Sequence, residues 1–176
     1  MHIFLQGERN IGKSTIISKT LGLLMAGGGI ELCGFLTWKG GEDDPHVYMR
    51  NAARPDEGEI TRIAVFDEKT GRMRPDVSAF NGAGADALKD RPGARLIIMD
   101  ELGMLESGAH RFKQSVFEAL ERKIPVLGVL RLGDIPWLRP IRDSGSTTIY
   151  KVNEKNRDAL PGEIAEELSQ IIGKPR

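Results

Sequence analysis

The sequence predicts an α/β fold in three layers, with helices on both faces of a mainly parallel central sheet and antiparallel hairpins extending that sheet. A strand, a helix and a second strand follow one another at the start of the chain, and strands joined through a helix pair in parallel. The continuous apolar run at 96–99 is typical of a central strand buried on both faces. Between about residues 39 and 94, short strand-like segments alternate with turn clusters, which indicates hairpins.

The first half of the chain begins with a predicted buried strand at 2–6 and a helix at about 13–26, whose apolar residues recur at helical spacing. The glycine run at 27–29 ends that helix, and a second strand is expected at 32–38. Two short strands, at 47–51 and 61–66, are separated by the turn clusters 40–45 and 53–58 and followed by a turn at 67–71. A short helix is expected around 77–89, although Gly82 and Gly84 interrupt it.

The second half returns to regular alternation of strands and helices. After the strand at 96–99, Ser107 is expected to cap a helix that buries Phe112, Val116, Phe117 and Leu120. Further strands are expected at 126–130 and 147–152. Pro161 opens a closing helix with Ile164, Leu168, Ile171 and Ile172 facing inward. The length predicts one domain over residues 1–176, with the hairpin-rich segment at about 39–94 as an insert.

The composition excludes several classes of protein. The chain has 176 residues, of which 25 are Lys or Arg and 25 are Asp or Glu, so the formal net charge is zero. Neutral charge and only 6% aromatic residues disfavour a nucleic-acid partner. No apolar run approaches the roughly 20 residues that span a bilayer, and no secretory signal is recognisable, so no membrane association and a cytoplasmic location are expected. Cys33 is the only cysteine, which excludes an intramolecular disulfide.

The strongest motif is Gly-Glu-Arg-Asn-Ile-Gly-Lys-Ser at 7–14, which fits the phosphate-binding loop pattern G-x-x-x-x-G-K-[ST] in full. It lies between a strand and a helix, where backbone N–H groups and the helix N-terminus can hold anionic oxygens. Lys13 is expected to reach the β- and γ-phosphates, and the Ser14 hydroxyl to bind Mg²⁺. The predicted nucleotide-binding residues of this segment are Gly7, Glu8, Arg9, Asn10, Ile11, Gly12, Lys13, Ser14 and Thr15.

Two acids follow the apolar run at 96–99. Asp100 and Glu101 would reach the carboxyl edge of the sheet, where open α/β sheets bind ligands. In that place Asp100 would hold Mg²⁺ through its water shell, and Glu101 would orient or deprotonate an attacking water. The alternative interpretation is that both are solvent-facing acids at the end of a strand.

Four separated motifs together resemble the THEP1-type nucleoside-triphosphatases. Besides the loop at 7–14, these motifs are Gly34-Phe35-Leu36-Thr37, the stretch Asp-Glu-Leu-Gly-Met-Leu-Glu at 100–106, and Asn156-Arg157-Asp158. The resemblance implies the P-loop NTPase fold and an enzyme that hydrolyses the terminal phosphate of ATP, GTP and related nucleotides with broad base tolerance. It also implies that Asn156 and Arg157 lie near the base or ribose, against the alternative of a loop hydrogen bond and a surface charge. Glu106 matches the last acid of the middle motif.

The chain departs from the family pattern in three places. Asn10 stands where the family loop has glycine, and asparagine tolerates the left-handed backbone that the loop needs. The family reads Thr-Ile-Pro where this chain has Val129, Leu130 and Arg131. Arg131 lies where a predicted strand reaches the same carboxyl edge, so it could neutralise charge on the transferring phosphoryl group, with Arg139 and Arg142 as alternatives. The other interpretation, for each of the three, is a surface or structural role. The insert lacks the family's arginine-rich hairpin, so substrate preference is not carried over.

The sequence leaves two other functions open. A nucleotide or nucleoside kinase uses the same loop, and the arginines between 131 and 142 could form its lid. A nucleotide-dependent switch is the second alternative, although the guanine-reading sequence Asn-Lys-x-Asp is missing. Hydrolysis is preferred because an acid directly follows the predicted metal-binding Asp100. The sequence identifies no protein partner.

Overall fold

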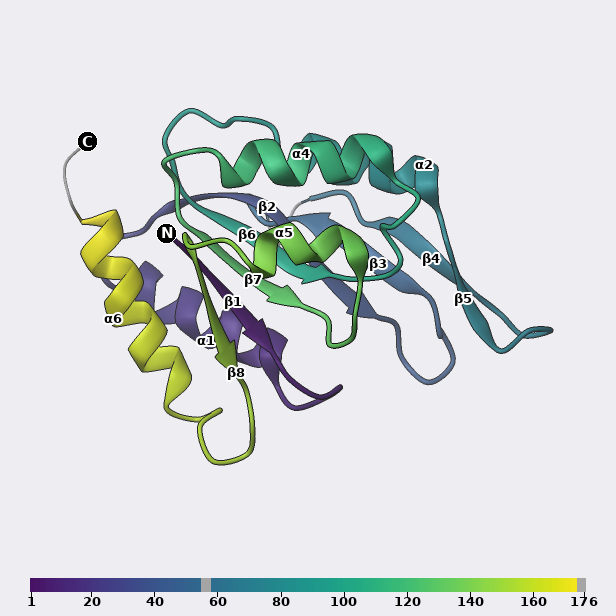
Figure 1. The fold of residues 1–176 in the computed structure, drawn as a ribbon, viewed down its shortest axis with the longest axis horizontal. Helices are drawn as coiled ribbons and strands as arrows, with labels where there is room; N and C mark the ends of the chain where they lie inside the picture. Colours follow the sequence, from purple (N-terminus) through teal and green to yellow (C-terminus); the bar gives the residue numbers. More distant parts are fainter. Residues whose placement is uncertain (55–57, 174–176) are drawn as a thin grey trace.

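The computed structural model describes residues 1–54 and 58–173, which form a mixed sheet of eight strands between two layers of helices (Figure 1). The strand order is β5-β4-β3-β2-β6-β7-β1-β8. The parallel strands are β1 (His2–Gln6), β2 (Glu31–Lys39), β6 (Ala94–Leu102), β7 (Val126–Leu130) and β8 (Thr147–Lys151). The antiparallel extension beyond β2 consists of β3 (Val47–Asn51), β4 (Thr61–Asp67) and β5 (Arg72–Pro75).

Alternating side chains of the central strands build a separate apolar core on each face of the sheet. In β6, Ile97 and Met99 belong to one core, whereas Leu96 and Ile98 belong to the other. All four are fully buried, because helices cover both faces. The part of β6 at 96–99 is therefore apolar at every residue, as predicted for a central parallel strand.

The helices divide between the two faces (Figure 1). The cores assign α1 (Lys13–Ala26) and α6 (Leu160–Ile172) to one face and α4 (His110–Leu120) to the other. The segment between β5 and β6 is helical throughout residues 77–87 and packs against α4; it consists of α2 (Val77–Ala79), the π-helix η1 (Phe80–Gly84) and α3 (Ala85–Ala87). Between β7 and β8 the chain forms the 3₁₀-helix η2 (Pro136–Leu138) and the short helix α5 (Arg139–Arg142).

Glycine is required where β2 passes closest to β6. Gly34 has φ +98°, in the region that favours glycine. A Cβ atom at this position would lie 2.0 Å from the carbonyl oxygen of Ile98. Any side chain at position 34 would therefore push apart the two strands whose ends lead to Thr37 and Asp100.

The structure confirms the predicted order of the main elements and changes several boundaries. The prediction that Ser107 caps helix α4 is wrong, because α4 begins at His110 after Ala109. The Ser107 hydroxyl donates a hydrogen bond to the sulfur of Met104 instead. Ala109 is fully buried, so packing rather than a polar cap determines where this helix begins. Strand β5 and the η2–α5 segment are additions that the sequence did not indicate. The predicted turn at 53–58 includes residues 55–57, which lie outside the described part of the chain.

A search of the described helices finds none that combines the length and the apolar character needed to span a bilayer.

Candidate active site

The loop between β1 and α1 has the backbone that its glycine pattern predicts. Gly12 precedes α1 with φ +106°, and Asn10 has φ +61°. Among the described residues, Asn10 is the only non-glycine residue with positive φ, so asparagine adopts the left-handed conformation that was expected at this departure from the family pattern. Gly7 lies against the residue that follows β8, since a Cβ atom at position 7 would be 2.7 Å from the Val152 carbonyl oxygen.

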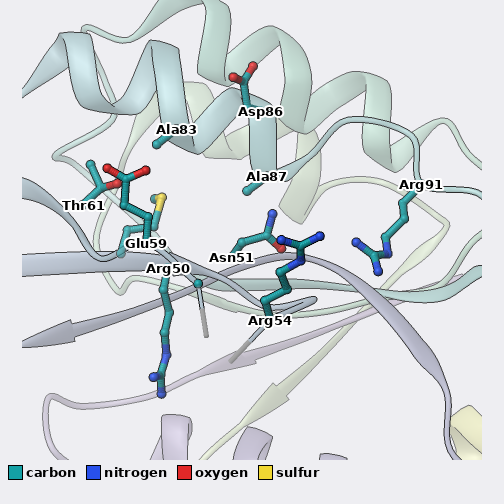
Figure 2. A pocket seen from close by; sticks show the side chains of 11 residues that line it. Arg50, Asn51, Arg54, Glu59, Thr61, Ala83, Asp86, Ala87 and Arg91 are labelled. Atoms are coloured by element: carbon teal, nitrogen blue, oxygen red, sulfur yellow. The ribbon is translucent and has the colours of Figure 1, made fainter. Parts of the chain in front are cut away.

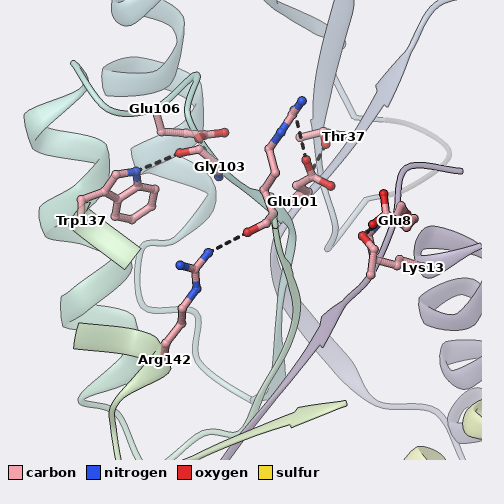
Figure 3. Close-up of polar contacts among 10 residues, drawn as sticks. Glu8, Lys13, Thr37, Glu101, Gly103, Glu106, Trp137 and Arg142 are labelled. Atoms are coloured by element: carbon pink, nitrogen blue, oxygen red, sulfur yellow. Dashed lines mark hydrogen bonds and ion pairs between the residues drawn. The ribbon is translucent and has the colours of Figure 1, made fainter. Parts of the chain in front are cut away.

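The side chain of Lys13 folds back over this loop (Figure 3). Its ammonium group donates hydrogen bonds to the carbonyl oxygens of Gly7 at 3.0 Å and Glu8 at 2.7 Å. Lys13 is buried, whereas Glu8, Arg9, Asn10, Ser14 and Thr15 are exposed, and Ile11 and Gly12 are half-buried. The loop therefore places one positive charge inside a ring of backbone groups and leaves its rim open to solvent.

Asp100 meets the loop from the neighbouring part of the sheet. It is only 3% exposed, and burial raises the pKa of its carboxyl group to about 7. A hydrogen bond from Ser14 and the charge of Lys13 act against this rise in pKa, while the nearby Glu101 carboxylate adds to it. The structure thus brings Asp100 together with both Lys13 and Ser14, and the alternative of two solvent-facing strand-end acids does not hold for Asp100.

Glu101 is half-buried beside Asp100 and faces Arg131. Its backbone amide donates a hydrogen bond to the hydroxyl of Thr37 at 3.2 Å (Figure 3). Its carboxylate forms an ion pair with the Arg131 guanidinium at 3.6 Å. Both side chains keep solvent access, so this long ion pair contributes little to stability and leaves both groups able to change partners.

Hydrogen bonds from the η2–α5 segment hold the strand ends that carry these residues (Figure 3). The Trp137 indole donates to the Gly103 carbonyl oxygen at 2.8 Å, just after β6. The Arg142 guanidinium donates to the Arg131 carbonyl oxygen at 2.7 Å, just after β7. Arg139, the other predicted alternative to Arg131, instead pairs with Asp134 at 2.8 Å on the surface.

Glu106 is a buried acid under this region. It is 4% exposed, and its carboxylate accepts a hydrogen bond from the Gly103 amide at 2.9 Å. Burial raises the pKa of Glu106 to about 7; the two backbone hydrogen bonds that it accepts and the charge of Arg131 oppose the rise, and Glu101 adds to it. Glu106 therefore holds the backbone of the loop that follows Asp100 and Glu101, through its hydrogen bond with Gly103.

The segment after β8 lies beside Gly7, because the Val152 amide donates to the Gln6 carbonyl oxygen at 2.7 Å. Asn156 uses its side chain within this segment: its amide donates to the Lys151 carbonyl oxygen at 2.9 Å, and its oxygen accepts from the Asn153 amide at 2.9 Å. Arg157 is exposed. These contacts match the loop hydrogen bond and the surface charge that the sequence left open as alternatives for these two residues.

Sequence reasoning missed three contributors to the site. Thr37 belongs to one of the family motifs, but its hydrogen bond with Glu101 joins two strands that are distant in sequence. No pattern of neighbouring residues indicates this contact. The indole of Trp137 donates a hydrogen bond to Gly103, and its ring packs edge-on against Phe117 with ring centroids 6.4 Å apart. Arg142 was an alternative for direct catalysis, and the structure shows its contact with the Arg131 backbone.

Comparisons with known proteins show the family of this chain. A sequence model of the family described as NTPase matches residues 2–165. A nucleoside-triphosphatase THEP1 from Methanosarcina barkeri is 30% identical, with 97% of this chain and 99% of the relative covered. A protein of the same name from Thermofilum pendens is 28% identical, with 98% of each chain covered.

Two solved structures share the fold. One is THEP1 from Aquifex aeolicus, with a TM-score of 0.77, 23% identity and coverage of 96% of this chain and 99% of the other. The second is a human cancer-related nucleoside triphosphatase, with a TM-score of 0.78, 21% identity and coverage of 96% and 97%. At these identities the structures show the fold alone, which is the P-loop NTPase fold. Together with the matches in sequence, they establish that this chain belongs to the NTPase family, alongside the THEP1 proteins.

Proposed function

We propose that this protein hydrolyses nucleoside triphosphates to diphosphate and phosphate in a Mg²⁺-dependent reaction with broad tolerance of the base. The observation that carries the proposal is the meeting of Asp100 with Ser14 and Lys13, which joins the metal-binding and phosphate-binding groups at one edge of the sheet. The names of the relatives, nucleoside-triphosphatases, support the same reaction. Neutral charge and the contacts of Trp38 and Trp137 within the protein give no support to a nucleic-acid substrate.

The oxygen donors of this site fit Mg²⁺. Ser14 supplies a hydroxyl and Asp100 a carboxylate, and magnesium in phosphate sites needs only one or two protein oxygens besides water and substrate phosphates. The described residues contain no group of three His, Cys, Asp or Glu side chains that could form an all-protein metal cage. When bound, the metal would neutralise charge on the β- and γ-phosphate oxygens.

The remaining roles follow from position. Lys13 would exchange its contacts with loop carbonyls for contacts with phosphate oxygens, together with the backbone N–H groups at 7–15. Glu101 would accept a proton from the attacking water, whose oxygen bonds to the γ-phosphorus as the bond to the β-phosphate oxygen breaks. Arg131 would leave its ion pair with Glu101 and stabilise charge on the transferring group.

The base is proposed to lie near the segment after β8, which contains Asn156 and Arg157 and begins with Val152 beside Gly7. Asn156 would act by shaping the segment, because its side chain bonds to Lys151 and Asn153. The assignment of residues 1–176 to one domain with an insert at about 39–94, and a cytoplasmic location, also stay predictions.

The proposal is tested by phosphate release from several triphosphates, with and without Mg²⁺, and by nucleotide binding. Lys13→Ala should lose binding, whereas Glu101→Gln should keep binding and lose turnover by about 100-fold or more, the usual contribution of a general base. Arg131→Ala should lower turnover by about 10- to 100-fold. Arg139→Ala is the matched control, since its guanidinium pairs with Asp134 away from Glu101. Equal turnover in all four variants and the parent would refute the assignment of the site.

The same assay separates the two alternative functions. A panel of nucleosides and nucleotides added with ATP would be phosphorylated by a kinase, whereas a hydrolase releases phosphate at an unchanged rate. The arginines expected in a lid instead contact the protein: Arg131 pairs with Glu101, Arg139 with Asp134, and Arg142 with the Arg131 backbone. Phosphate release that is unaffected by Glu101→Gln would favour a nucleotide-dependent switch.

A further inference from the structure

A cavity lies between β3, the helical segment 77–87 and the chain that enters β6 (Figure 2). Its volume is about 460 Å³, within the range of small-molecule sites. Asn51, at the end of β3, pairs with Phe35 in the middle of β2, and Arg91 contacts Glu31 at the start of β2. Neither the loop at 7–15 nor Asp100 or Glu101 is among the residues that line this cavity.

Three hydrogen-bond donors meet in this cavity. Figure 2 shows the guanidinium groups of Arg54 and Arg91 turned toward the same part of the pocket as the side chain of Asn51. The Asn51 side-chain oxygen accepts a hydrogen bond from the Ala53 amide at 2.9 Å, so the nitrogen of the same amide is the group left to donate into the cavity. Within the described ranges, no residue forms a hydrogen bond or an ion pair with the Arg54 side chain.

Among the described residues, the charges around the cavity neutralise these donors only in part. Arg91 has one long ion pair, with Glu31 at 3.4 Å, in which both side chains are exposed. Such a pair contributes little and can rearrange at low cost. Glu59 also lines the cavity, but in the described part of the chain it forms no hydrogen bond or ion pair with Arg54 or Arg91. Figure 2 shows it on the far side of the pocket, next to Thr61.

The other two charged lining residues are engaged elsewhere. Asp86 already has two cationic partners, Lys89 at 2.9 Å and Arg111 at 3.0 Å, and its carboxylate points away from the two arginines (Figure 2). The Arg50 guanidinium lies over the Trp38 ring, 5.2 Å from its centre. Of the charged lining residues that the structure describes, Arg54 and Arg91 are therefore the two that remain directed at one spot.

We propose that this cavity binds a phosphate group, either free or carried by a small organic molecule, at a site separate from the phosphate-binding loop. Two guanidinium groups that converge repel each other, and a phosphate between them removes the repulsion while accepting paired N–H hydrogen bonds from each. The Asn51 amide supplies a neutral donor beside them. Ala83, which also lines the cavity, belongs to the π-helix η1, a type of distortion that is frequent at functional sites.

The test uses the whole protein and follows the side-chain N–H signals of its arginines by NMR during titration with inorganic phosphate. The same titration with glycerol 3-phosphate distinguishes an organic phosphate from the free ion, and sodium chloride at matched ionic strength controls for screening. The Arg54 and Arg91 signals should shift as phosphate is added, and the shifts should reach saturation before roughly 50 mM phosphate. This concentration is well above the expected Kd of about 1 mM. Lys13→Ala should leave these shifts in place, because it removes only phosphate binding at the loop.

Arg54→Ala and Arg91→Ala should each weaken this binding by about tenfold, as expected for loss of a charge-assisted hydrogen bond. Both side chains are on the surface, and thermal unfolding would verify that the variants fold. The matched control is Arg74→Ala, an exposed arginine on β5 that does not line the cavity and should leave the affinity within about twofold of the parent. Shifts that chloride reproduces, that Lys13→Ala abolishes, or that persist unchanged in Arg54→Ala and Arg91→Ala would overturn the proposal.

Discussion

Replacing Glu106 by glutamine should change how the stability of this protein depends on pH. Glu106 is 4% exposed, and its pKa is raised from 4.5 to about 7, chiefly by burial. Between pH 4.5 and about pH 7, the folded protein therefore keeps a proton on Glu106 that the unfolded chain releases. The stability linked to this proton is fully present below pH 4.5 and is lost as the pH rises through 7. Glutamine has the same shape and can still accept the Gly103 hydrogen bond, but it does not titrate.

The two pKa values determine the expected size of the effect. One unit of pKa difference corresponds to about 1.4 kcal/mol, so the shift of Glu106 corresponds to about 3 kcal/mol in all. Between about pH 5 and about pH 8, the free energy of unfolding of the parent should fall by about 2 to 3 kcal/mol relative to Glu106→Gln. Asp100, whose pKa is also raised to about 7, is present in both proteins, so its contribution largely cancels in the difference.

Urea unfolding of both proteins at several values of pH, extrapolated linearly to water, measures this difference directly. The glutamine variant should gain stability over the parent as the pH rises. A difference in unfolding free energy that stays constant from about pH 5 to about pH 8 would show that Glu106 titrates normally in the folded protein, and would refute the inference from its burial.

Substitutions at three further positions test the fold, each by chemical or thermal unfolding. Gly34→Ala should destabilise by more than about 3 kcal/mol, because its Cβ atom would meet the Ile98 carbonyl oxygen and its φ is positive; a variant as stable as the parent would contradict the close approach of β2 and β6. Phe112→Ala should cost about 3 to 5 kcal/mol, since its fully buried ring packs 5.4 Å from the rings of both Phe35 and Phe80; a loss below about 1 kcal/mol would mean that this core collapses around the gap. Asn10→Val should cost about 1 to 2 kcal/mol because of the left-handed backbone, whereas Asn10→Gly should stay within about 1 kcal/mol of the parent; equal stabilities would show a relaxed loop.

Trp137 offers a natural optical probe of the same region. Its indole donates to the carbonyl oxygen of Gly103, three residues after Asp100, so its fluorescence should respond when nucleotide and Mg²⁺ bind. The other tryptophan, Trp38, stacks on Tyr48 with ring centroids 5.9 Å apart, and Trp38→Phe removes its signal from the measurement. A response that survives Lys13→Ala would not come from the proposed nucleotide site.

The parts of the site that sequence alone determined are those encoded by neighbouring residues. The loop at 7–14 is a contiguous motif, and the requirement of its backbone for small or left-handed residues is met by Gly12 and Asn10. Asp100 and Glu101 follow an apolar run whose burial on both faces makes it a central parallel strand, so their place at the carboxyl edge could be predicted. Periodicity likewise predicted the main helices, because it depends only on which residues share one face.

Tertiary structure decided which distant segments meet, because such contacts depend on how strands and helices pack rather than on local pattern. The sequence pattern did not indicate the ion pair between Arg131 and Glu101, or the hydrogen bonds from Trp137 and Arg142 to the ends of two strands. It did not indicate the burial of Glu106 either. The start of α4 at His110 rather than after Ser107 has the same cause, since the burial of Ala109 outweighs a local cap. The sequence determines which chemical groups the site contains. The distances between these groups and their pKa values are determined only when the sheet and its helices bring them together.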